Sequence, residues 1–213
     1  MILLGLTGSI GMGKTTTAGL FREAGVPVWE ADAAVHALYG PGGAAATMIE
    51  AAFPGTTGSA GVDREALGRL MTQSPDLLPR LEAIVHPLLA GERAAFLDRA
   101  RADGADVAVF DVPLLFETRG DAALDAIVVV SAPEAVQRAR VLARPGMTPE
   151  KLDALLARQL PDTDKRARAD FVIDTSQGLD VARVQVAEVL AQVRRPDFTS
   201  RRSRVDAGAE RIQ

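Results

Sequence analysis

The stretch GLTGSIGMGKTTTA, residues 5 to 18, constrains the fold of this chain more than any other part of its sequence. Residues 8 to 15 within it read G-x-x-x-x-G-K-T, the pattern of a loop that wraps phosphate groups. An apolar run over residues 1 to 7 predicts a buried parallel strand before the loop, and the residues after it predict a helix that ends at Gly25. Such a loop gathers backbone N–H groups and the positive end of a helix at one point. The stretch therefore predicts an α/β nucleotide-binding protein.

Each residue type in this loop has a physical task. Glycines let the backbone fold around an oxyanion, Lys14 is expected to reach the β and γ phosphates, and the Thr15 hydroxyl is expected to ligate Mg²⁺. Lysine is rare here, since only three of the 24 basic residues are lysine, and one of them occupies this position. The structural alternative is a glycine-rich turn with an incidental lysine. The residues expected to contact the nucleotide are Gly8, Gly11, Met12, Gly13, Lys14, Thr15 and Thr16.

Composition narrows the class of protein. With 213 residues, of which 47% are hydrophobic, the chain fits one mid-sized domain or a domain with an insert. A net charge of −4 argues against general attraction to nucleic acid or an anionic membrane, and no apolar run approaches the ~20 residues of a membrane helix. We therefore expect a cytoplasmic protein without a nucleic-acid or membrane partner, and the sequence leaves its oligomeric state open. The absence of cysteine excludes disulfides and thiolate catalysis, and the absence of asparagine excludes the Asn-Lys-x-Asp element by which GTPases read guanine.

Further apolar runs predict the rest of the sheet. Strands are expected at residues 26–29, 106–112, 126–130 and 170–174, with helix start signals at Ser131 and Thr148 between the later ones. Strands that alternate with helices indicate a three-layer α/β fold with a parallel sheet of about five strands. The predicted nucleotide-binding core is 1–32 with 105–195 and contains a helical lid at about 138–168. A helical insert covers 33–104, with a loop at 53–61, and a disordered tail covers 196–213.

A small-molecule kinase needs more than the phosphate loop. It needs a carboxylate beside the acceptor hydroxyl, a second carboxylate near Mg²⁺, and mobile arginines that close over the transferred group. Asp32 lies in the EAD segment that follows the second predicted strand and fits the first role. Asp111 ends the apolar run VAVF of the third strand and fits the second role. Arginines are available at 138, 140 and 144, of which Arg140 and Arg144 are the stronger candidates.

These residues also have structural alternatives. Asp32 could cap a helix over residues 33–39, and Asp111 could be a surface turn residue. Arginines on a helix often form a solvated face. A binding module that holds ATP without transferring phosphate is a further alternative, as is a kinase for a nucleoside monophosphate or another small hydroxyl acceptor.

The order of several motifs resembles the dephospho-coenzyme A kinase family. That family opens with a GLTGGIGSGKST-like loop and a DAD segment, followed by D-R-x-x-L, H-P, P-L-L-F-E, Q-x-x-R-x-x-x-R and AD-x-V-I. The resemblance runs in order over residues 1 to about 175. This chain shows GLTGSIGMGKTT, EAD at 30–32, Asp63-Arg64 with Leu67, His86-Pro87, PLLFE at 113–117, Gln137 with Arg140 and Arg144, and Ala169-Asp170 with Val172-Ile173.

The resemblance implies an α/β P-loop kinase that uses ATP and Mg²⁺ to phosphorylate the ribose 3′-hydroxyl of dephospho-coenzyme A. Asp32 would accept or orient the hydroxyl proton, while Lys14 and the arginines Arg140 and Arg144 would offset charge on the transferred group. Thr15 and Asp111 would bind the metal. The helical insert would hold the acceptor. The residues implied as acceptor contacts are His86, Leu115, Glu117, Asp63 and Arg64.

Two of the implied acceptor contacts also have a purely structural interpretation. A histidine at a helix end before proline can have a capping or packing role, and Glu117 has the same two interpretations.

Four positions depart from the family pattern. Ser9 replaces a glycine, Met12 a serine, Glu30 an aspartate, and Thr175 an asparagine that often follows V-I-D. Ser9 is the least favourable of these if its position needs positive φ, because a Cβ makes that conformation costly. None of the four removes an expected phosphate ligand.

Overall fold

The computed structural model describes residues 1–201 and divides the chain into two compact units. Unit 1 combines residues 1–28 with the described chain from residue 103 onward, and unit 2 comprises residues 29–102. The predicted insert, residues 33–104, therefore corresponds closely to unit 2. The two units are described separately below.

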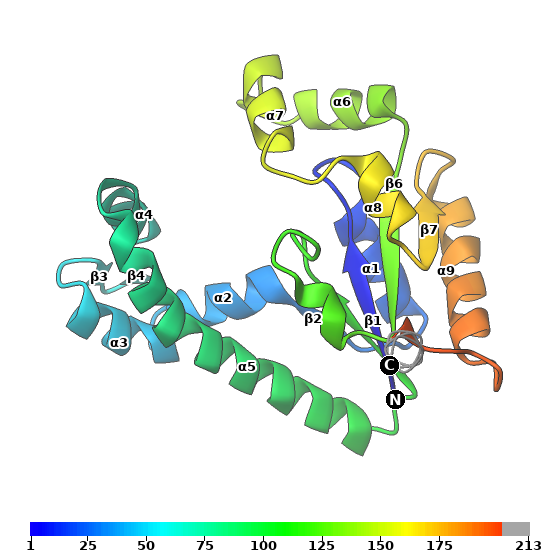
Figure 1. The fold of residues 1–213 in the computed structure, drawn as a ribbon, viewed down its shortest axis with the longest axis horizontal. Coiled ribbons are helices and arrows are strands. Elements are labelled where there is room, and N and C mark those ends of the chain that lie inside the picture. Colours follow the sequence, from blue (N-terminus) through cyan, green and yellow to red (C-terminus); the bar gives the residue numbers. More distant parts are fainter. Residues whose placement is uncertain (202–213) are drawn as a thin grey trace, which may run out of the picture. The chain divides into compact units, whose positions relative to one another are not determined.

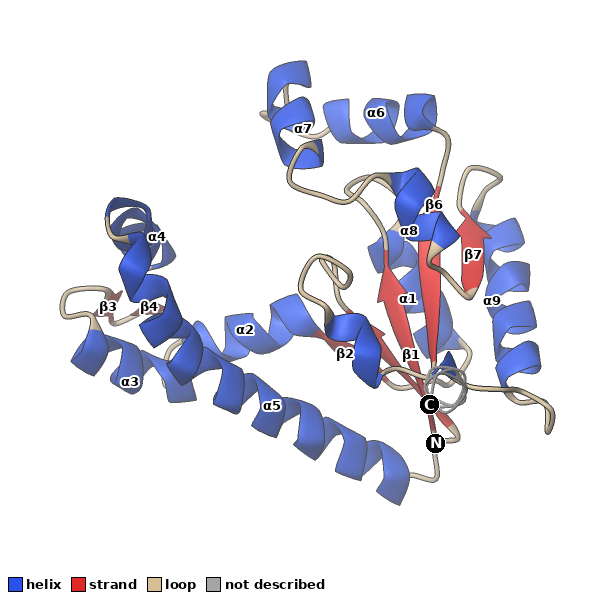
Figure 2. Ribbon diagram, in the orientation of Figure 1, coloured by secondary structure: helices blue, strands red, loops and turns tan. Residues whose placement is uncertain are grey.

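A five-stranded sheet forms the centre of unit 1 (Figures 1 and 2), with the order β2-β5-β1-β6-β7. Its strands are β1 (Ile2–Thr7), β2 (Val28–Glu30), β5 (Val107–Asp111), β6 (Ala126–Ser131) and β7 (Phe171–Asp174). The pairs β1–β5, β1–β6 and β6–β7 are all parallel. The five predicted strands are thus confirmed, with their ends shifted by one or two residues. Because β1 is central, the loop that follows it emerges at the middle of the sheet's carboxyl edge.

Helices α1 (Lys14–Glu23) and α9 (Leu179–Val193) contact each other beside the sheet, α1 against β1 and β5 and α9 against β7. The core between them and the sheet includes Leu4, Phe21 and Ile173, all fully buried. The remaining helices of unit 1 are α6 (Glu134–Leu142), α7 (Pro149–Leu156) and α8 (Asp162–Ala167), with a short 3₁₀ turn at Gly120–Ala123. They cover most of the stretch predicted as the lid.

Two helix starts test the capping signals. Thr148 caps α7 as predicted, because its hydroxyl accepts a hydrogen bond from Lys151 N–H at 3.3 Å. The prediction for Ser131 is wrong, since α6 begins after Pro133 without a side-chain cap. The Ser131 hydroxyl instead donates to Asp162 Oδ2 at 2.7 Å, which ties the end of β6 to α8. A tertiary partner has replaced the local cap.

Unit 2 is helical, as predicted, and has its own core. It contains α2 (Ala31–Tyr39), α3 (Ala44–Ala52), α4 (Arg64–Gln73), a 3₁₀ turn at Pro75–Leu77 and α5 (Leu78–Ala102). The stretch predicted as loop at 53–61 forms part of a small antiparallel hairpin, β3 (Thr57–Gly58) with β4 (Gly61–Val62). The core of unit 2 gathers buried side chains from four helices, the hairpin and a connecting loop: Leu38, Ala45, Ile49, Phe53, Val62, Leu67 and Val85.

The start of the predicted tail is ordered in its described part. Phe198 packs against the core of unit 1, and Arg201 N–H donates to the Asp125 carbonyl at 2.6 Å. The Arg201 guanidinium also donates to the Arg168 carbonyl at 2.9 Å. The prediction of disorder from residue 196 therefore does not hold for these residues, and the rest of the predicted tail, 202–213, lies outside the described residues.

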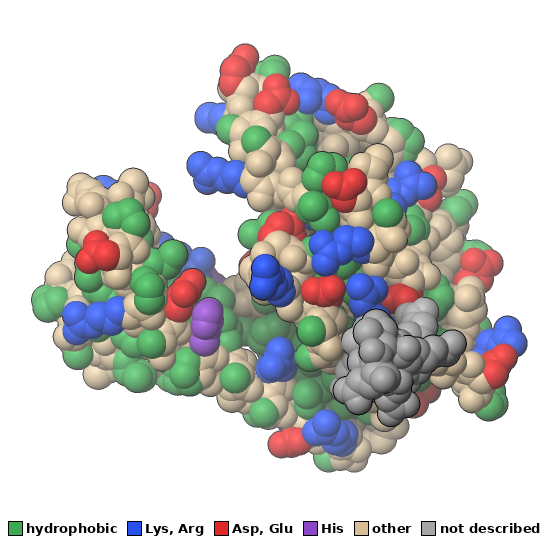
Figure 3. All heavy atoms as spheres, viewed as in Figure 1, with side chains coloured by type: hydrophobic (Ala, Val, Ile, Leu, Met, Phe, Trp, Pro, Cys, Tyr) green, Lys and Arg blue, Asp and Glu red, His purple; other side chains and the backbone are tan. Residues whose placement is uncertain are grey.

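Acidic and basic side chains are interspersed on the face drawn in Figure 3. No helix within residues 1–201 is long and apolar enough to cross a membrane.

Candidate phosphate and nucleotide site

The G-x-x-x-x-G-K-T loop joins β1 to α1 at the carboxyl edge of the sheet. Gly11 and Gly13 adopt φ values of 80° and 92°, which side chains with a Cβ rarely adopt. A Cβ on Gly8 would lie 2.6 Å from the Val130 carbonyl oxygen, so Gly8 is required by the close approach of β6. Gly13 occupies the N-cap position of α1 without a side-chain cap, and the first turn carries no acidic residue. The positive end of α1 thus has no acidic side chain in its first turn, which is compatible with the anion-binding role expected from the sequence pattern.

Ser9 fits this loop without strain. Arg119 is the one non-glycine residue within 1–201 that has a positive φ, so the backbone of Ser9 avoids the left-handed region. Its carbonyl accepts a hydrogen bond from Met12 N–H at 3.1 Å, which closes a turn inside the loop. The glycine-to-serine departure therefore carries no backbone penalty.

Met12 supports the loop with its side chain, which is 2% exposed. Its sulfur accepts a hydrogen bond from Ala132 N–H at 3.1 Å, just beyond the end of β6. A contact between Met12 and a nucleotide would therefore come from its backbone.

Lys14 and Asp111 form an ion pair beside the loop, in which Lys14 Nζ donates a hydrogen bond to Asp111 Oδ1. Lys14 is the first residue of α1 and Asp111 the last of β5, where it pairs in register with Leu6 of β1. Asp111 is 5% exposed, so the alternative of a surface turn residue is wrong. The carboxylate expected near the metal lies beside the lysine expected to bind phosphate.

The three threonines after Lys14 differ in their surroundings. Thr15 and Thr16 are exposed, whereas Thr17 is buried and its hydroxyl donates to the Gly13 carbonyl at 3.2 Å. The hydroxyl of Thr15 is therefore accessible for the metal-binding role predicted for it.

Arg140 and Thr175 brace the loop from the other side. The Arg140 guanidinium donates to the Thr175 hydroxyl at 2.8 Å and to its carbonyl at 2.7 Å. The same hydroxyl donates to the Met12 carbonyl at 2.8 Å. Thr175, which departs from the family's asparagine, therefore links Arg140 of α6 to the phosphate loop.

A cavity of about 340 Å³ opens beside the loop. Glycine backbone, two arginine side chains and an apolar wall from α9 line this cavity. Such surroundings suit a flat aromatic base, because arginine stacks on aromatic rings. The sequence motifs do not point to the wall formed by Gly178, Leu179 and Ala182, which follow β7 in the chain. The lining residues are Gly11, Gly13, Thr16, Thr17, Arg140, Arg144, Thr175, Gly178, Leu179 and Ala182.

The stretch after β5 holds two residues implied as acceptor contacts, Leu115 and Glu117. Leu115 is 1% exposed, and a Cβ on Gly5 would lie 2.9 Å from one of its methyl carbons. Its side chain belongs to the core, which favours a structural role for this side chain over the implied contact with the acceptor. The amino-acid pattern PLLFE does not reveal which of its two leucines is buried.

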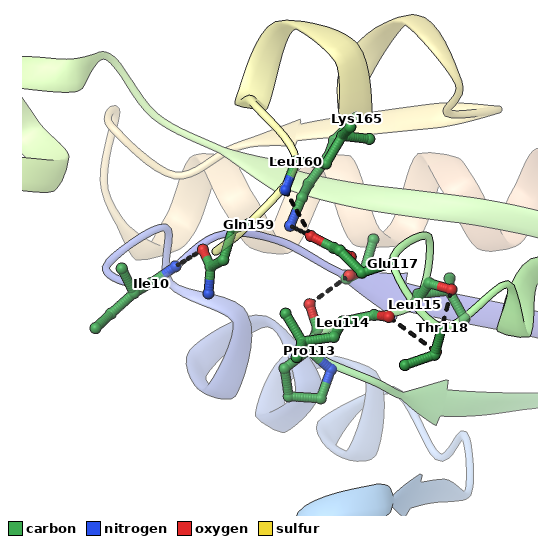
Figure 4. A network of polar contacts seen from close by, with 10 residues as sticks. Ile10, Pro113, Leu114, Leu115, Glu117, Thr118, Gln159, Leu160 and Lys165 are labelled. Atoms are coloured by element: carbon green, nitrogen blue, oxygen red, sulfur yellow. Dashed lines mark hydrogen bonds and ion pairs between the residues drawn. The ribbon is translucent and has the colours of Figure 1, made fainter. Parts of the chain in front are cut away.

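The Glu117 carboxylate makes internal contacts in unit 1 (Figure 4). It accepts a hydrogen bond from Leu160 N–H at 2.8 Å and forms an ion pair with Lys165 at 3.0 Å. The Lys165 side chain is fully buried and that of Glu117 is 19% exposed. Burial acts to raise the pKa of Glu117, but the Leu160 N–H and the Lys165 ammonium outweigh it, so the pKa lies below the usual value of 4.5. These contacts favour the structural interpretation of Glu117.

Asp32 lies in the first turn of α2, directly after β2, and is exposed. The N-cap position of that helix is Glu30, which makes no side-chain cap hydrogen bond. The alternative that Asp32 caps the helix is therefore wrong, and its carboxylate is free of that task.

The other predicted residues of unit 2 have varied surroundings. Asp63 caps α4 by accepting hydrogen bonds from Glu65 and Ala66 N–H, and Arg64 stacks over the Tyr39 ring at 5.3 Å. His86 is exposed and lies within α5, which continues through Pro87. The interpretation of His86 as a helix-end residue is wrong. Packing of α5 on α3 and α2 outweighs the hydrogen bond that proline removes.

Comparison with known proteins identifies the relatives of this chain. The family model described as dephospho-CoA kinase matches residues 2–180. The chain belongs to the dephospho-CoA kinase family. A dephospho-CoA kinase of Rhodopseudomonas palustris is 60% identical over 190 residues, which cover 89% of this chain and 94% of the relative. One of Nitrobacter winogradskyi is 59% identical over 191 residues, 90% of this chain and 95% of the relative.

Solved structures support the fold. A protein from Thermus thermophilus matches with a TM-score of 0.77 and 34% identity, covering 90% of this chain and 97% of that chain. The dephospho-CoA kinase from Campylobacter jejuni matches with a TM-score of 0.60 and 20% identity over 90% of this chain and 96% of its own. The phosphate loop, Asp111 and all the residues that line the cavity except Ala182 lie within the portion matched by the family model.

Proposed function

We propose that this protein transfers the γ-phosphoryl group of ATP to the ribose 3′-hydroxyl of dephospho-CoA, giving CoA and ADP. The observation that carries the proposal is the match to the dephospho-CoA kinase family across a chain whose phosphate loop has the required geometry. A bond forms between the acceptor oxygen and phosphorus while the bond to the β-phosphate oxygen breaks.

The residues of the loop bind and align the donor. The backbone around Gly11 and Gly13 and the amino end of α1 surround the phosphates. Lys14 exchanges its partner Asp111 for the β and γ phosphates. Arg140 and Arg144 offset charge on the transferred group, as predicted from the family resemblance. They also line the adjoining cavity, where the adenine ring binds. Transfer passes through a loose transition state, so this alignment contributes more than proton abstraction.

The donor set at the loop fits Mg²⁺. Thr15 offers an exposed hydroxyl and Asp111 a carboxylate, both hard oxygen ligands. Within residues 1–201, no three histidine, cysteine or acidic side chains gather in a way that could hold a metal. Mg²⁺ commonly binds through one or two protein oxygens together with phosphates and water. When bound, the ion neutralises charge on the β and γ phosphates.

Asp32 acts on the acceptor. As an exposed carboxylate just beyond the carboxyl end of β2, it accepts or orients the proton of the 3′-hydroxyl. Unit 2 binds the rest of dephospho-CoA, with His86 as a candidate contact because its side chain is exposed. The cytoplasm, predicted from the sequence, remains the proposed compartment.

Mass spectrometry tests the reaction directly. After incubation with ATP, Mg²⁺ and dephospho-CoA, we expect the acceptor to gain one phosphate, and fragmentation to place it on the ribose 3′ oxygen. AMP, CMP and shikimate should react far more slowly. A comparable rate on AMP would reassign the enzyme as a nucleoside monophosphate kinase, and ATP binding without turnover on any acceptor would indicate a binding module.

A further inference from the structure

Ile10 lies within the phosphate loop and is held on both sides by glutamine side chains, one from α6 and one from the stretch between α7 and α8. Gln137 of α6 donates from Nε2 to the Ile10 carbonyl at 2.8 Å. Gln159, between α7 and α8, accepts the Ile10 N–H on Oε1 at 3.2 Å (Figure 4). A backbone N–H can only donate and a carbonyl can only accept, so these partners also fix which end of each amide faces the loop.

The two contacts hold two different peptide groups. Gln159 fixes the peptide between Ser9 and Ile10, and Gln137 fixes the peptide between Ile10 and Gly11. Because a trans peptide is planar, its C=O and N–H point in opposite directions. When the Ile10 carbonyl points at Gln137, the Gly11 N–H points away from it.

The backbone of Gly11 does not by itself fix the orientation of the peptide between Ile10 and Gly11. A flip of the peptide before it would change its φ from the observed 80° to a negative value, which glycine adopts as readily. A larger residue is excluded, since a Cβ on Gly11 would lie 2.4 Å from a methyl group of Val141. Because α6 packs so closely against position 11, only glycine fits there, and glycine leaves the peptide between Ile10 and Gly11 free to flip. The hydrogen bond from the Gln137 amide restrains this peptide.

Gln159 is itself held in place. The N–H of the next residue, Leu160, donates to the Glu117 carboxylate at 2.8 Å, and Glu117 pairs with the fully buried Lys165. Figure 4 shows the Glu117 carboxylate joined by dashed lines to Leu160 and to Lys165, and Gln159 joined to Ile10. Gln137 is 4% exposed, so its amide is shielded from competing water.

We propose that Gln137 and Gln159 are positioning residues of the phosphate loop, which fix the peptides on either side of Ile10 and direct the Gly11 N–H toward the bound phosphates. The inference rests on the proposed function, in which this loop holds ATP. If this inference holds, the segment from α6 to the start of α8 is part of the ATP site even without a conformational change, because Gln137 and Gln159 determine the shape of the loop.

Paired substitutions test the inference through the chemistry of each contact. Gln137→Met and Gln159→Met remove the donor and the acceptor respectively, and each should weaken ATP binding by about tenfold. Gln159→Glu keeps an acceptor for the Ile10 N–H, whereas Gln137→Glu has no donor for the Ile10 carbonyl. Both place one negative charge against the same residue. We therefore expect Gln159→Glu to bind ATP more tightly than Gln159→Met, and Gln137→Glu to bind no better than Gln137→Met.

The measurements are the Kd for ATP by calorimetry, well below the melting temperature, and the melting temperature without nucleotide. Gln192→Met, on the exposed side of α9, is the control for the substitution itself. Variants that melt at lower temperature but bind ATP with the wild-type Kd would overturn the inference and leave the glutamines a structural role. If the Gln137 variants do not fold, the Gln159 pair decides alone, since equal Kd values for Gln159→Met and wild type would overturn it.

The wild-type protein separates this inference from the proposed function. If it binds ATP but does not phosphorylate dephospho-CoA, the proposed reaction fails, while the order of Kd values among the variants still tests the loop. If it binds no ATP, both fail.

Discussion

Lys14 at the start of α1 and Asp111 at the end of β5 form a nearly buried ion pair, although 97 residues separate them in the chain. The register of β5 on β1 brings them together, since Asp111 lies opposite Leu6, just before the loop begins. The pair holds the lysine at the loop without nucleotide. In the proposed function, a phosphate that binds there takes over the ammonium and leaves the carboxylate available for a cation.

Lys14→Met should lower kcat by about 10²- to 10³-fold, because it removes a cation that stabilises charge on the transferred group. It also removes the ion-pair partner Lys14 from the buried Asp111 carboxylate, so the free energy of unfolding should fall by about 1–3 kcal/mol. A coupled assay of ADP release and urea denaturation measure the two effects. A variant with normal turnover would contradict the assignment of Lys14.

Asp32→Asn should retain the wild-type Kd for ATP and lose kcat by about 10²- to 10⁴-fold, the usual contribution of a general base. Because alignment is expected to contribute more than proton abstraction, a loss near the lower end of this range would indicate that Asp32 mainly orients the hydroxyl. Glu30→Gln, two residues earlier, is the matched control for loss of a carboxylate at this strand end. Equal kcat values for Asp32→Asn and wild type would remove Asp32 from the mechanism.

Thr175→Val should weaken ATP binding by about tenfold, because it breaks both the hydrogen bond to the Met12 carbonyl and the one from Arg140. Thr175→Asn restores the residue common in the family and can offer both a donor and an acceptor, so it should bind ATP more tightly than Thr175→Val. Titration with ATP measures the two variants. Identical affinities would show that the brace between β7 and the loop does not influence the nucleotide.

Leu115→Ala should lower the free energy of unfolding by about 2–5 kcal/mol, since the leucine is buried against Gly5 in the core. The KM for dephospho-CoA should stay near the wild-type value in the folded fraction. Leu114→Ala, at an exposed neighbour, should have a much smaller effect on stability. A raised KM without loss of stability in Leu115→Ala would restore Leu115 as an acceptor contact.

The Glu117–Lys165 pair should make stability depend on pH in acid. The folded-state pKa of Glu117 lies below its usual 4.5, so the folded state favours the ionised carboxylate. Its contribution is fully present above pH 4.5 and is lost as the pH falls through the lower folded-state value. The melting temperatures of wild type and Glu117→Gln should therefore differ at pH 7 and converge as the pH falls below 4.5. A constant difference across this range would show that Glu117 contributes through packing alone.

The phosphate loop and the sheet could be predicted from the sequence because their causes are local. Positive φ at Gly11 and Gly13 and the start of α1 at Lys14 follow from a few adjacent residues. The five strands are short apolar runs between turn residues, and their order of appearance with helices determines a parallel arrangement.

The tertiary structure alone decided which side chains are buried and with which distant partners they pair. Gln159 contacts Ile10 across 149 residues of chain. Glu117 forms an ion pair with a buried lysine, and Ser131 hydrogen-bonds to Asp162 instead of capping a helix. Such pairs leave no periodic signal in the sequence, because the free energy that fixes them comes from burial created by the whole fold. For the same reason the helix through Pro87 and the core position of Leu115 emerged only from the packing around them.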